Sequence, residues 1–108
     1  MSLKQSQKQI DDVMQAYETP YWHPLSQLAR LLEESGELAR LLNHLYGEKP
    51  KKQSEAQQEL GGEIADVLFT LMCLANSQNI DLDEELAKVI DKVVTRDGNR
   101  FKKKSQLE

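Results

Sequence analysis

Apolar residues recur at helical spacing in four segments of the chain, and the alternation typical of strands is hard to find anywhere. The first segment has apolar residues at i, i+3, i+4 and i+7, which form one stripe along a helix: Ile10, Val13, Met14 and Tyr17. This helix should end before Pro20, because proline cannot continue a helix interior. The pattern therefore predicts an all-α chain.

The second and fourth helices carry clear start and stop signals. The second is expected over residues 25–46, since Gly47 follows its last periodic residue and Pro50 comes three positions later. The fourth should begin after Asp81, which can accept hydrogen bonds from the first turn, and end near Asp97–Gly98. The remainder, from about residue 99, is predicted to be a basic C-terminal tail.

The third helix has a less certain beginning. Ser54, with Gln57 three residues later, is typical of a capping box, which would open a helix that reaches to about Ser77. Gly61 and Gly62 weaken this prediction, because each glycine costs a helix interior about 1 kcal/mol relative to alanine. Either the helix starts later, or another backbone approaches closely at the glycines. In both cases the fold class is all-α, a four-helix bundle in one domain over residues 1–108.

Length and composition narrow the class of protein. A chain of 108 residues has room for one domain, and its longest apolar stretch, residues 67–75, is shorter than the roughly 20 residues that cross a membrane. The N-terminus has no apolar core of a secretory signal, so we expect a cytoplasmic protein without a membrane partner. The lone Cys73 stands in the apolar stretch and should be buried as a small hydrophobe. A net charge of −4 disfavours a protein that binds a nucleic acid polymer, although basic residues gather between positions 92 and 104.

Two pairs of carboxylates stand on apolar helix faces. Glu34 and Glu37 share the face of the second helix with leucines, and Glu63 and Asp66 are flanked by valine and leucine on the third. Burial of an ionised carboxylate in this way costs several kcal/mol unless a positively charged group pairs with it. Oxygen donors on two neighbouring helices favour a hard divalent cation, Mg²⁺ with Mn²⁺ as the other candidate, although Arg30 could instead neutralise the first pair as a structural ion pair.

These acids also carry a family resemblance. The segments E-E-S-G-E-L-A (33–39) and E-I-A-D-V-L (63–68) resemble the E-E-x-x-E … E-x-x-D signature of the MazG-like, all-α nucleoside triphosphate pyrophosphohydrolases. The strings NHLYGEKPKK and CLANS are similar to the short, single-domain members of the YpjD type. The resemblance implies a Mg²⁺-dependent enzyme that cuts a nucleoside triphosphate into a nucleoside monophosphate and pyrophosphate. It also implies a house-cleaning role on non-standard nucleotides.

The resemblance assigns a role to each acid. Glu34, Glu37, Glu63 and Asp66 match the metal ligands of the family, and Glu33 matches a further acid often present beside them. Either Glu33 or a ligand carboxylate could orient the attacking water as a general base. We expect Glu33 to be the catalytic residue of this set.

The remaining candidates concern the nucleotide itself. Lys92 and Arg96 stand four apart beside the apolar stripe of the fourth helix, where they either contact the outer phosphates or form an ordinary solvated edge. Trp22 either stacks on the base or anchors the core, and Asn76 either hydrogen-bonds the sugar or base or caps the end of the third helix. All four are predicted as substrate-binding residues.

Assembly follows from the apolar character of the third helix. Four helices of this size cannot surround a helix that is apolar nearly all round, so part of its surface should meet another subunit. The resemblance also implies a homo-oligomer, and we expect a tetramer rather than a dimer, with sites completed across subunits. The alternative function is a non-catalytic helical interaction module whose acidic faces bind a basic protein. That alternative requires the acids to lie on solvent-facing stripes.

Overall fold

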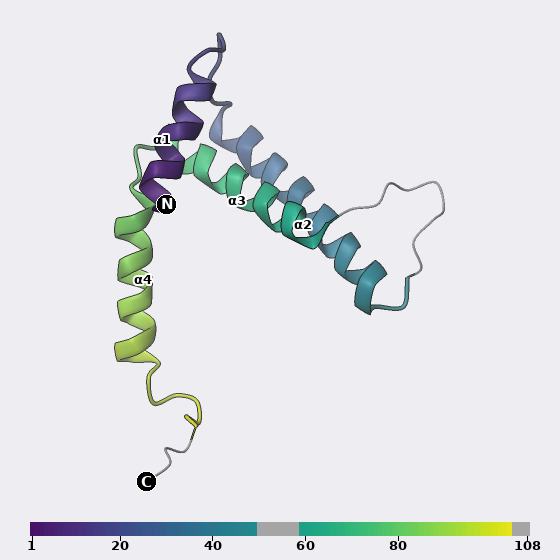
Figure 1. Cartoon of the computed structure of the whole chain (residues 1–108), viewed down its shortest axis with the longest axis vertical. Helices are drawn as coiled ribbons and strands as arrows, with labels where there is room; N and C mark the ends of the chain where they lie inside the picture. Colours follow the sequence, from purple (N-terminus) through teal and green to yellow (C-terminus); the bar gives the residue numbers. More distant parts are fainter. Residues whose placement is uncertain (50–58, 105–108) are drawn as a thin grey trace.

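Four α-helices make up the described part of the protein (Figure 1). The structure is a computed structural model, and it describes residues 1–49 and 59–104. In chain order the helices are α1 (Leu3–Met14), α2 (Pro24–Tyr46), α3 (Leu60–Ser77) and α4 (Leu82–Arg96). Neither described range contains a strand, so the all-α prediction is confirmed.

Capping fixes the ends of α2 and α4 close to the predicted positions. Pro24 opens α2, and the Nδ1 atom of His23 accepts a hydrogen bond from the backbone N–H of Leu25 at 3.1 Å. The side chain of Asp81 accepts hydrogen bonds from two backbone N–H groups in the first turn of α4. By contrast, α1 ends at Met14, one turn earlier than its apolar stripe indicated.

The glycines of α3 lie in its first turn, not in its interior. The helix begins at Leu60, immediately before Gly61 and Gly62. Of the two explanations for the glycines, a later start of the helix is therefore the correct one. A Cβ atom added to either glycine would meet no other atom within 4 Å, so no other backbone packs closely there. The expected capping box of Ser54 and Gln57 lies outside the described residues.

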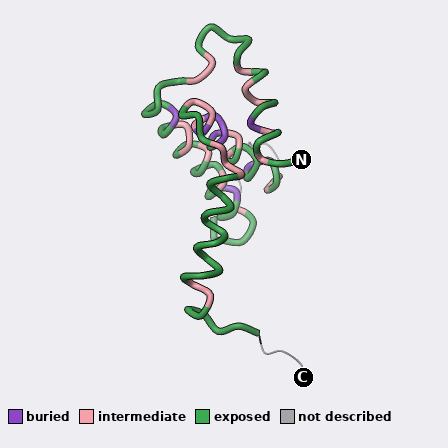
Figure 2. Tube along the Cα trace, turned by 90° about the vertical axis from the view of Figure 1, so that its left-hand side faces the viewer, coloured by how far each residue is buried: buried purple, intermediate pink, exposed green. Residues whose placement is uncertain are grey.

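Helices α2 and α3 lie side by side in antiparallel orientation and form the centre of the fold (Figure 1). Each presents a stripe of buried and half-buried residues at helical spacing, and both stripes include a carboxylate. On α2 the stripe consists of Gln27, Leu31, Glu34, Leu38 and Leu41, and on α3 of Glu63, Val67, Thr70 and Leu74. Figure 2 shows that the buried positions of the described chain lie on the first three helices, and none lies on α4.

A buried amide joins α1 to the end of α3 and the start of α4. Gln7, only 7% exposed, donates from Nε2 to Oδ1 of Asn76 at 3.0 Å and to the carbonyl of Ile80 at 2.8 Å. Its Oε1 accepts a hydrogen bond from the backbone N–H of Leu82 at 3.0 Å. Asn76 in turn donates to the Gln7 carbonyl at 3.0 Å and to Oη of Tyr21 at 3.1 Å. Three helices therefore meet at one fully hydrogen-bonded junction.

The turn between α3 and α4 completes this junction. Asn79 has a φ of 56°, and the backbone N–H of Ile80 donates to the carbonyl of Ala75 at 2.9 Å, which is the pattern of a Schellman motif. Asparagine tolerates this left-handed conformation better than most residues. The carboxylate of Asp83 then accepts hydrogen bonds from the first two backbone N–H groups of α1, each at 3.1 Å. The beginning of α4 is thus tied to the beginning of α1.

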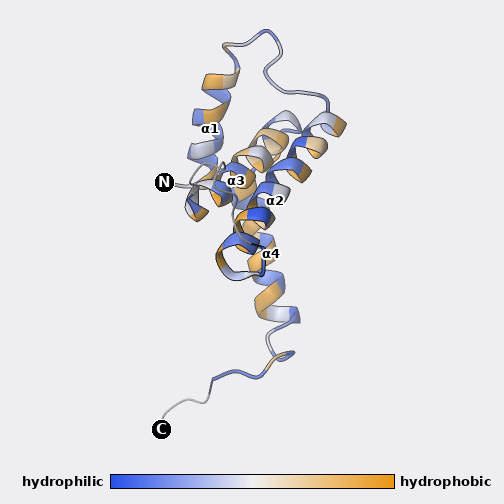
Figure 3. Cartoon of the chain, turned by 90° about the vertical axis from the view of Figure 1, so that its right-hand side faces the viewer, coloured by the Kyte–Doolittle hydropathy of each residue, from blue (hydrophilic) through white to orange (hydrophobic). Residues whose placement is uncertain are grey.

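Beyond this junction α4 extends away from α2 and α3 (Figure 1). Its apolar stripe, visible as orange patches in Figure 3, is 46–55% exposed and consists of Leu86, Val89, Ile90 and Val93. The radius of gyration is 18.1 Å, whereas a compact domain of this length has about 13 Å. The four predicted helices are present, but a single chain does not close them into a bundle.

Among the residues that the structure describes, one helix, α3, is long and apolar enough to cross a membrane by length and composition alone. Core helices of soluble proteins pass the same test. Here α3 packs against α2 and α1, and it carries Glu63 and Asp66 within its first two turns. We therefore interpret α3 as the central helix of the fold.

Replacing Gln7 with leucine should lower the free energy of unfolding by about 2 kcal/mol or more. The substitution leaves the Ile80 carbonyl and the Leu82 N–H without their partner, and each unpaired buried group costs about 1–3 kcal/mol. Urea unfolding followed by circular dichroism, at one fixed protein concentration, measures the loss. Gln9→Leu, at an exposed position of α1, is the matched control and should change stability by less than about 0.5 kcal/mol. Equal losses in both variants would contradict the role of Gln7.

Candidate functional site

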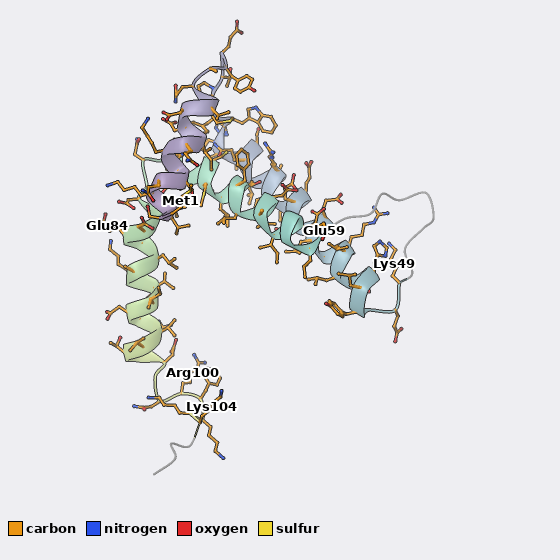
Figure 4. All side chains as sticks on the ribbon, viewed as in Figure 1. Met1, Lys49, Glu59, Glu84, Arg100 and Lys104 are labelled. Carbon is orange, nitrogen blue, oxygen red and sulfur yellow. The ribbon has the colours of Figure 1, made fainter. Side chains whose placement is uncertain are left out.

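Three carboxylates gather where α2 meets the beginning of α3. Glu34, Glu63 and Asp66 each offer one oxygen, and these oxygens all lie within 4.8 Å of one another. The antiparallel pairing brings Glu34 from the middle of α2 to the first turns of α3. In Figure 4 the Glu59 label marks the beginning of α3. Glu63 is buried with 8% exposure, Glu34 is half-buried and Asp66 is exposed. We call these three residues the acid cluster.

The acid cluster is electrostatically strained. Burial raises the pKa of the Glu63 carboxyl above its ordinary value, and the negative charges of Asp66, Glu37 and Glu34 raise it further. Among the described residues, no basic side chain forms an ion pair with the cluster. A group of close carboxylates without a cationic partner suits a hard divalent cation, which prefers oxygen ligands and keeps several waters. The residues present therefore fit such an ion.

The other two acids of the predicted set occupy different positions. Glu37 is exposed on α2 and contributes its charge to the surroundings of Glu63, but it lies outside the group of three. Glu33 is also exposed, on the same helix. The predicted inward orientation therefore describes Glu63 and, in part, Glu34, whereas Asp66 and Glu37 face the open side of this single chain.

The predicted phosphate-binding residues lie apart from the acid cluster within one chain. Lys92 and Arg96 are exposed on α4, which extends away from α2 and α3 (Figure 1). The Nε atom of Arg96 lies 3.3 Å from a carboxylate oxygen of Asp97. A single copy of the chain does not bring these cations to the acids.

The two residues that are predicted to contact the sugar or base, Asn76 and Trp22, lie in different surroundings. The side chain of Asn76 makes hydrogen bonds to Gln7 and Tyr21 at the junction of α1 and α3. Trp22 is 53% exposed in the loop between α1 and α2. Asn76 therefore has a structural role in this chain, whereas Trp22 presents much of its ring to solvent.

A cavity of about 370 Å³ lies between the α1–α2 loop and the two central helices. The guanidinium carbon of Arg30 lies 5.7 Å from the centre of the Trp22 ring and 5.8 Å from that of Phe69. The cavity also has the polar groups of Gln27 and Thr70 in its wall, and its remaining lining residues are Met14, Tyr17, Thr19, Pro20, Tyr21 and Cys73. Arg30 therefore contacts aromatic rings in this cavity and does not pair with Glu34.

Sequence reasoning did not identify this cavity. The prediction that Cys73 is buried is confirmed, and burial raises the pKa of its thiol. One signal was available: Gln27 stands on the same helical stripe as Leu31 and Leu38, so an uncharged polar residue interrupts an apolar face. The partners of Arg30 could not be found in this way, because Phe69 comes from a different helix.

Comparison with known proteins identifies the family. The family model of the MazG nucleotide pyrophosphohydrolase domain matches residues 23–101, a range that contains the acid cluster and the predicted phosphate-binding residues Lys92 and Arg96. The chain belongs to the MazG nucleotide pyrophosphohydrolase family. This confirms the resemblance seen in the acidic segments.

Relatives within the MazG family are similar over nearly the whole chain. The uncharacterized protein YpjD of Bacillus subtilis (strain 168) is 46% identical over 105 residues, which cover 97% of this chain and 95% of that protein. The crystal structure of YPJD from Bacillus subtilis has a TM-score of 0.80 at 46% identity and covers 88% of this chain and 97% of the other. The Bacillus-conserved MazG protein, described as a nucleotide pyrophosphohydrolase, has a TM-score of 0.77 at 41% identity, with 89% and 93% covered.

A variant without the charge of Glu63 should distinguish cation binding at the acid cluster from the stability of the fold itself. Glu63→Gln should raise the melting temperature of the metal-free protein, because it relieves burial and repulsion of a charged group. Mg²⁺ should raise the melting temperature of the unmodified protein, since an ion at about 100 times its Kd stabilises by about 2.7 kcal/mol. It should raise that of the variant much less. Thermal unfolding with EDTA or with MgCl₂ measures both effects.

Glu18→Gln, at an exposed position in the α1–α2 loop, is the control and should keep the full response to Mg²⁺. If Mg²⁺ stabilised the unmodified protein and Glu63→Gln equally, the acid cluster would not be the cation site.

Proposed function

We propose that the protein is a Mg²⁺-dependent nucleoside triphosphate pyrophosphohydrolase, which releases a nucleoside monophosphate and pyrophosphate by cleavage between the α and β phosphates. The acid cluster carries this proposal, because three close carboxylates on facing helices form a site for a divalent cation in a chain of the MazG family. Mn²⁺ is a second candidate ion. A role in removing non-standard nucleotides from the cytoplasm completes the proposal.

Each acid has a part in the proposed reaction. Glu34, Glu63 and Asp66 hold the ion, and Glu37, which contributes its charge to the same surroundings, is the fourth ligand. A bound Mg²⁺ supplies charge neutralisation at the phosphate oxygens and favours ionisation of water. A carboxylate oxygen of Glu33, on the same helix as Glu34, accepts the proton from the attacking water.

The cations of the proposed site come from a second copy of the chain. Lys92 and Arg96 lie on the only helix without a buried residue in the described part, beside its exposed apolar stripe. A second exposed stripe runs along α3 at Ile64, Leu68 and Leu71. The chain exposes 8910 Å², whereas a compact monomer of its mass exposes about 6,100 Å². These features support a homo-oligomer, for which we favour a tetramer over a dimer.

The non-catalytic interaction module remains the second candidate. The exposure of Asp66 and Glu37 favours it, because a basic protein could reach both carboxylates. The burial of Glu63 favours the enzyme, since a buried carboxylate with a raised pKa is of little use at a protein interface. We therefore prefer the enzyme.

Catalysis should depend on the acids and on Mg²⁺. In a panel of ordinary and modified nucleoside triphosphates, the protein should release pyrophosphate with Mg²⁺ and none with EDTA. Asp66→Asn and Glu37→Gln should each lower turnover by more than about 100-fold. Mutation of a residue that only supports a metal ligand lowers activity by about 10- to 100-fold, and loss of the ligand itself should lower it further. Circular dichroism should show the same helix content in both variants.

Glu18→Gln should keep full activity, because this residue lies outside the acid cluster. Release of orthophosphate alone would indicate a different bond and contradict the proposal. No release with any nucleotide would favour the interaction module.

Two inactive variants should restore activity when mixed, if sites form between subunits. Asp66→Asn removes a ligand of the cation, and the double variant Lys92→Ala with Arg96→Ala removes the two proposed phosphate-binding residues of α4. A mixed oligomer contains a site with both halves intact, so pyrophosphate release should reappear after subunit exchange. Size-exclusion chromatography with light scattering gives the subunit number. A monomer, or exchange without recovered activity, would place the cations outside the site.

A further inference from the structure

Arg30 is a half-buried cation without a hydrogen-bonding partner in the described chain. Within residues 1–49 and 59–104 its guanidinium makes neither an ion pair nor a hydrogen bond, and its contacts are the rings of Trp22 and Phe69. A polar group partly removed from water without a partner lowers stability. Such a group is tolerated more readily where a ligand supplies the missing acceptors.

Contact with aromatic rings leaves the donors of Arg30 available. A guanidinium stacks through its flat face, whereas its five N–H donors lie in its plane. A planar ligand that accepts hydrogen bonds from Arg30 shares this plane. Such a ligand would lie beside the rings of Trp22 and Phe69, whose centres are 5.7 Å and 5.8 Å from the guanidinium carbon.

The wall of the cavity suits a flat heterocycle. It is mainly apolar and aromatic, and its polar residues besides the tyrosines are Arg30, Gln27, Thr19 and Thr70. Binding cavities for small molecules combine such walls with a few fixed polar groups. Aromatic side chains also provide stacking surfaces for nucleobases.

Gln27 holds this wall in place. It is 5% exposed, and its Nε2 donates to the carbonyl of Trp22 at 2.6 Å and to Oγ of Ser77 at 3.2 Å. Its Oε1 is buried and makes no hydrogen bond in the part of the chain that the structure describes. The loop that carries Trp22 is therefore tied to α3 by a residue whose own hydrogen bonding is incomplete.

The cavity stands one helical turn from the acid cluster. Arg30 precedes Glu34 by four residues on α2, and Thr70 follows Asp66 by four residues on α3, where its Oγ1 donates to the Asp66 carbonyl at 2.9 Å. Four residues correspond to about 6 Å along each helix axis. A sugar can span this separation, with the base in the cavity and the phosphates at the acids.

We propose that this cavity binds the base of the nucleotide and that Arg30 selects bases with two adjacent hydrogen-bond acceptors. Cytosine presents N3 and O2, and guanine presents O6 and N7, whereas adenine places an amino donor beside N7 and uracil separates its two carbonyls by an N–H. The fork of Arg30 can donate twice to the first two bases and only once to the others. This inference rests on the proposed function for the identity of the ligand.

Trp22 makes a direct test feasible, because it is the only tryptophan of the chain and it stands at the cavity. The full-length protein is titrated with CMP, GMP, UMP and AMP in EDTA, and tryptophan fluorescence is corrected for absorption with N-acetyltryptophanamide. CMP or GMP should quench at concentrations about 10-fold lower than UMP and AMP, since a bidentate contact discriminates by about 1–3 kcal/mol. Comparison of CMP with GMP shows which of the two bases the cavity accepts.

Arg30→Lys keeps the positive charge but loses the fork, so the preference among the four monophosphates should disappear. Arg100→Lys, in the exposed segment after α4, is the matched control and should retain the preference. Circular dichroism checks that both variants keep their helices. In the Mg²⁺ assay, Arg30→Lys should raise KM for CTP or GTP about 10-fold with little change in kcat, while KM for UTP and ATP stays the same.

Equal quenching by all four monophosphates, no quenching by any of them, or a preference that survives Arg30→Lys would overturn the inference. The titration contains neither Mg²⁺ nor a triphosphate, so its outcome is independent of pyrophosphate release. Pyrophosphate release without base preference would leave the proposed function in place and remove only the role of Arg30. Base-selective quenching without pyrophosphate release would support the role of Arg30 and contradict the proposed function.

Discussion

Repulsion between carboxylates on the two central helices is the constraint on which the rest of this structure depends. The interface between α2 and α3 provides most of the packing of the chain, yet its facing stripes include Glu34 and Glu63, and Asp66 stands beside them. Burial and neighbouring charges keep the pKa of Glu63 raised. A cation in the cluster would therefore have two effects: it would take part in the proposed reaction, and it would relieve the repulsion between the carboxylates.

The sequence predicted those features that depend on local chemistry. Gly47 gave the end of α2 and Asp81 the beginning of α4, because glycine and a capping carboxylate act on the backbone beside them. The acids that form the cluster followed from their spacing along one helix face. Their unequal exposure did not, because it depends on which faces α2 and α3 turn toward each other.

Features that join distant segments were beyond such reasoning. Gln7 lies 69 residues from Asn76, and nothing in the neighbourhood of Gln7 distinguishes it from the other glutamines of α1. The cavity depends likewise on Arg30 and Phe69, which come from different helices. The open arrangement of α4 is a further case: its sequence predicts an amphipathic helix, but the periodicity does not state whether its own chain or a second copy covers the apolar stripe.

The junction of α1, α3 and α4 consists mainly of amides, and amides do not titrate. Gln7 and Asn76 donate and accept in the same way at any physiological pH, and the Tyr21 hydroxyl, which accepts a hydrogen bond from Asn76, has its pKa raised to about 12 by burial and by its hydrogen bond to Asp11. The acid cluster at the other end of α3 consists of ionisable groups alone. One helix thus connects a pair of amides whose hydrogen bonds do not depend on acidity with a cluster whose charge does.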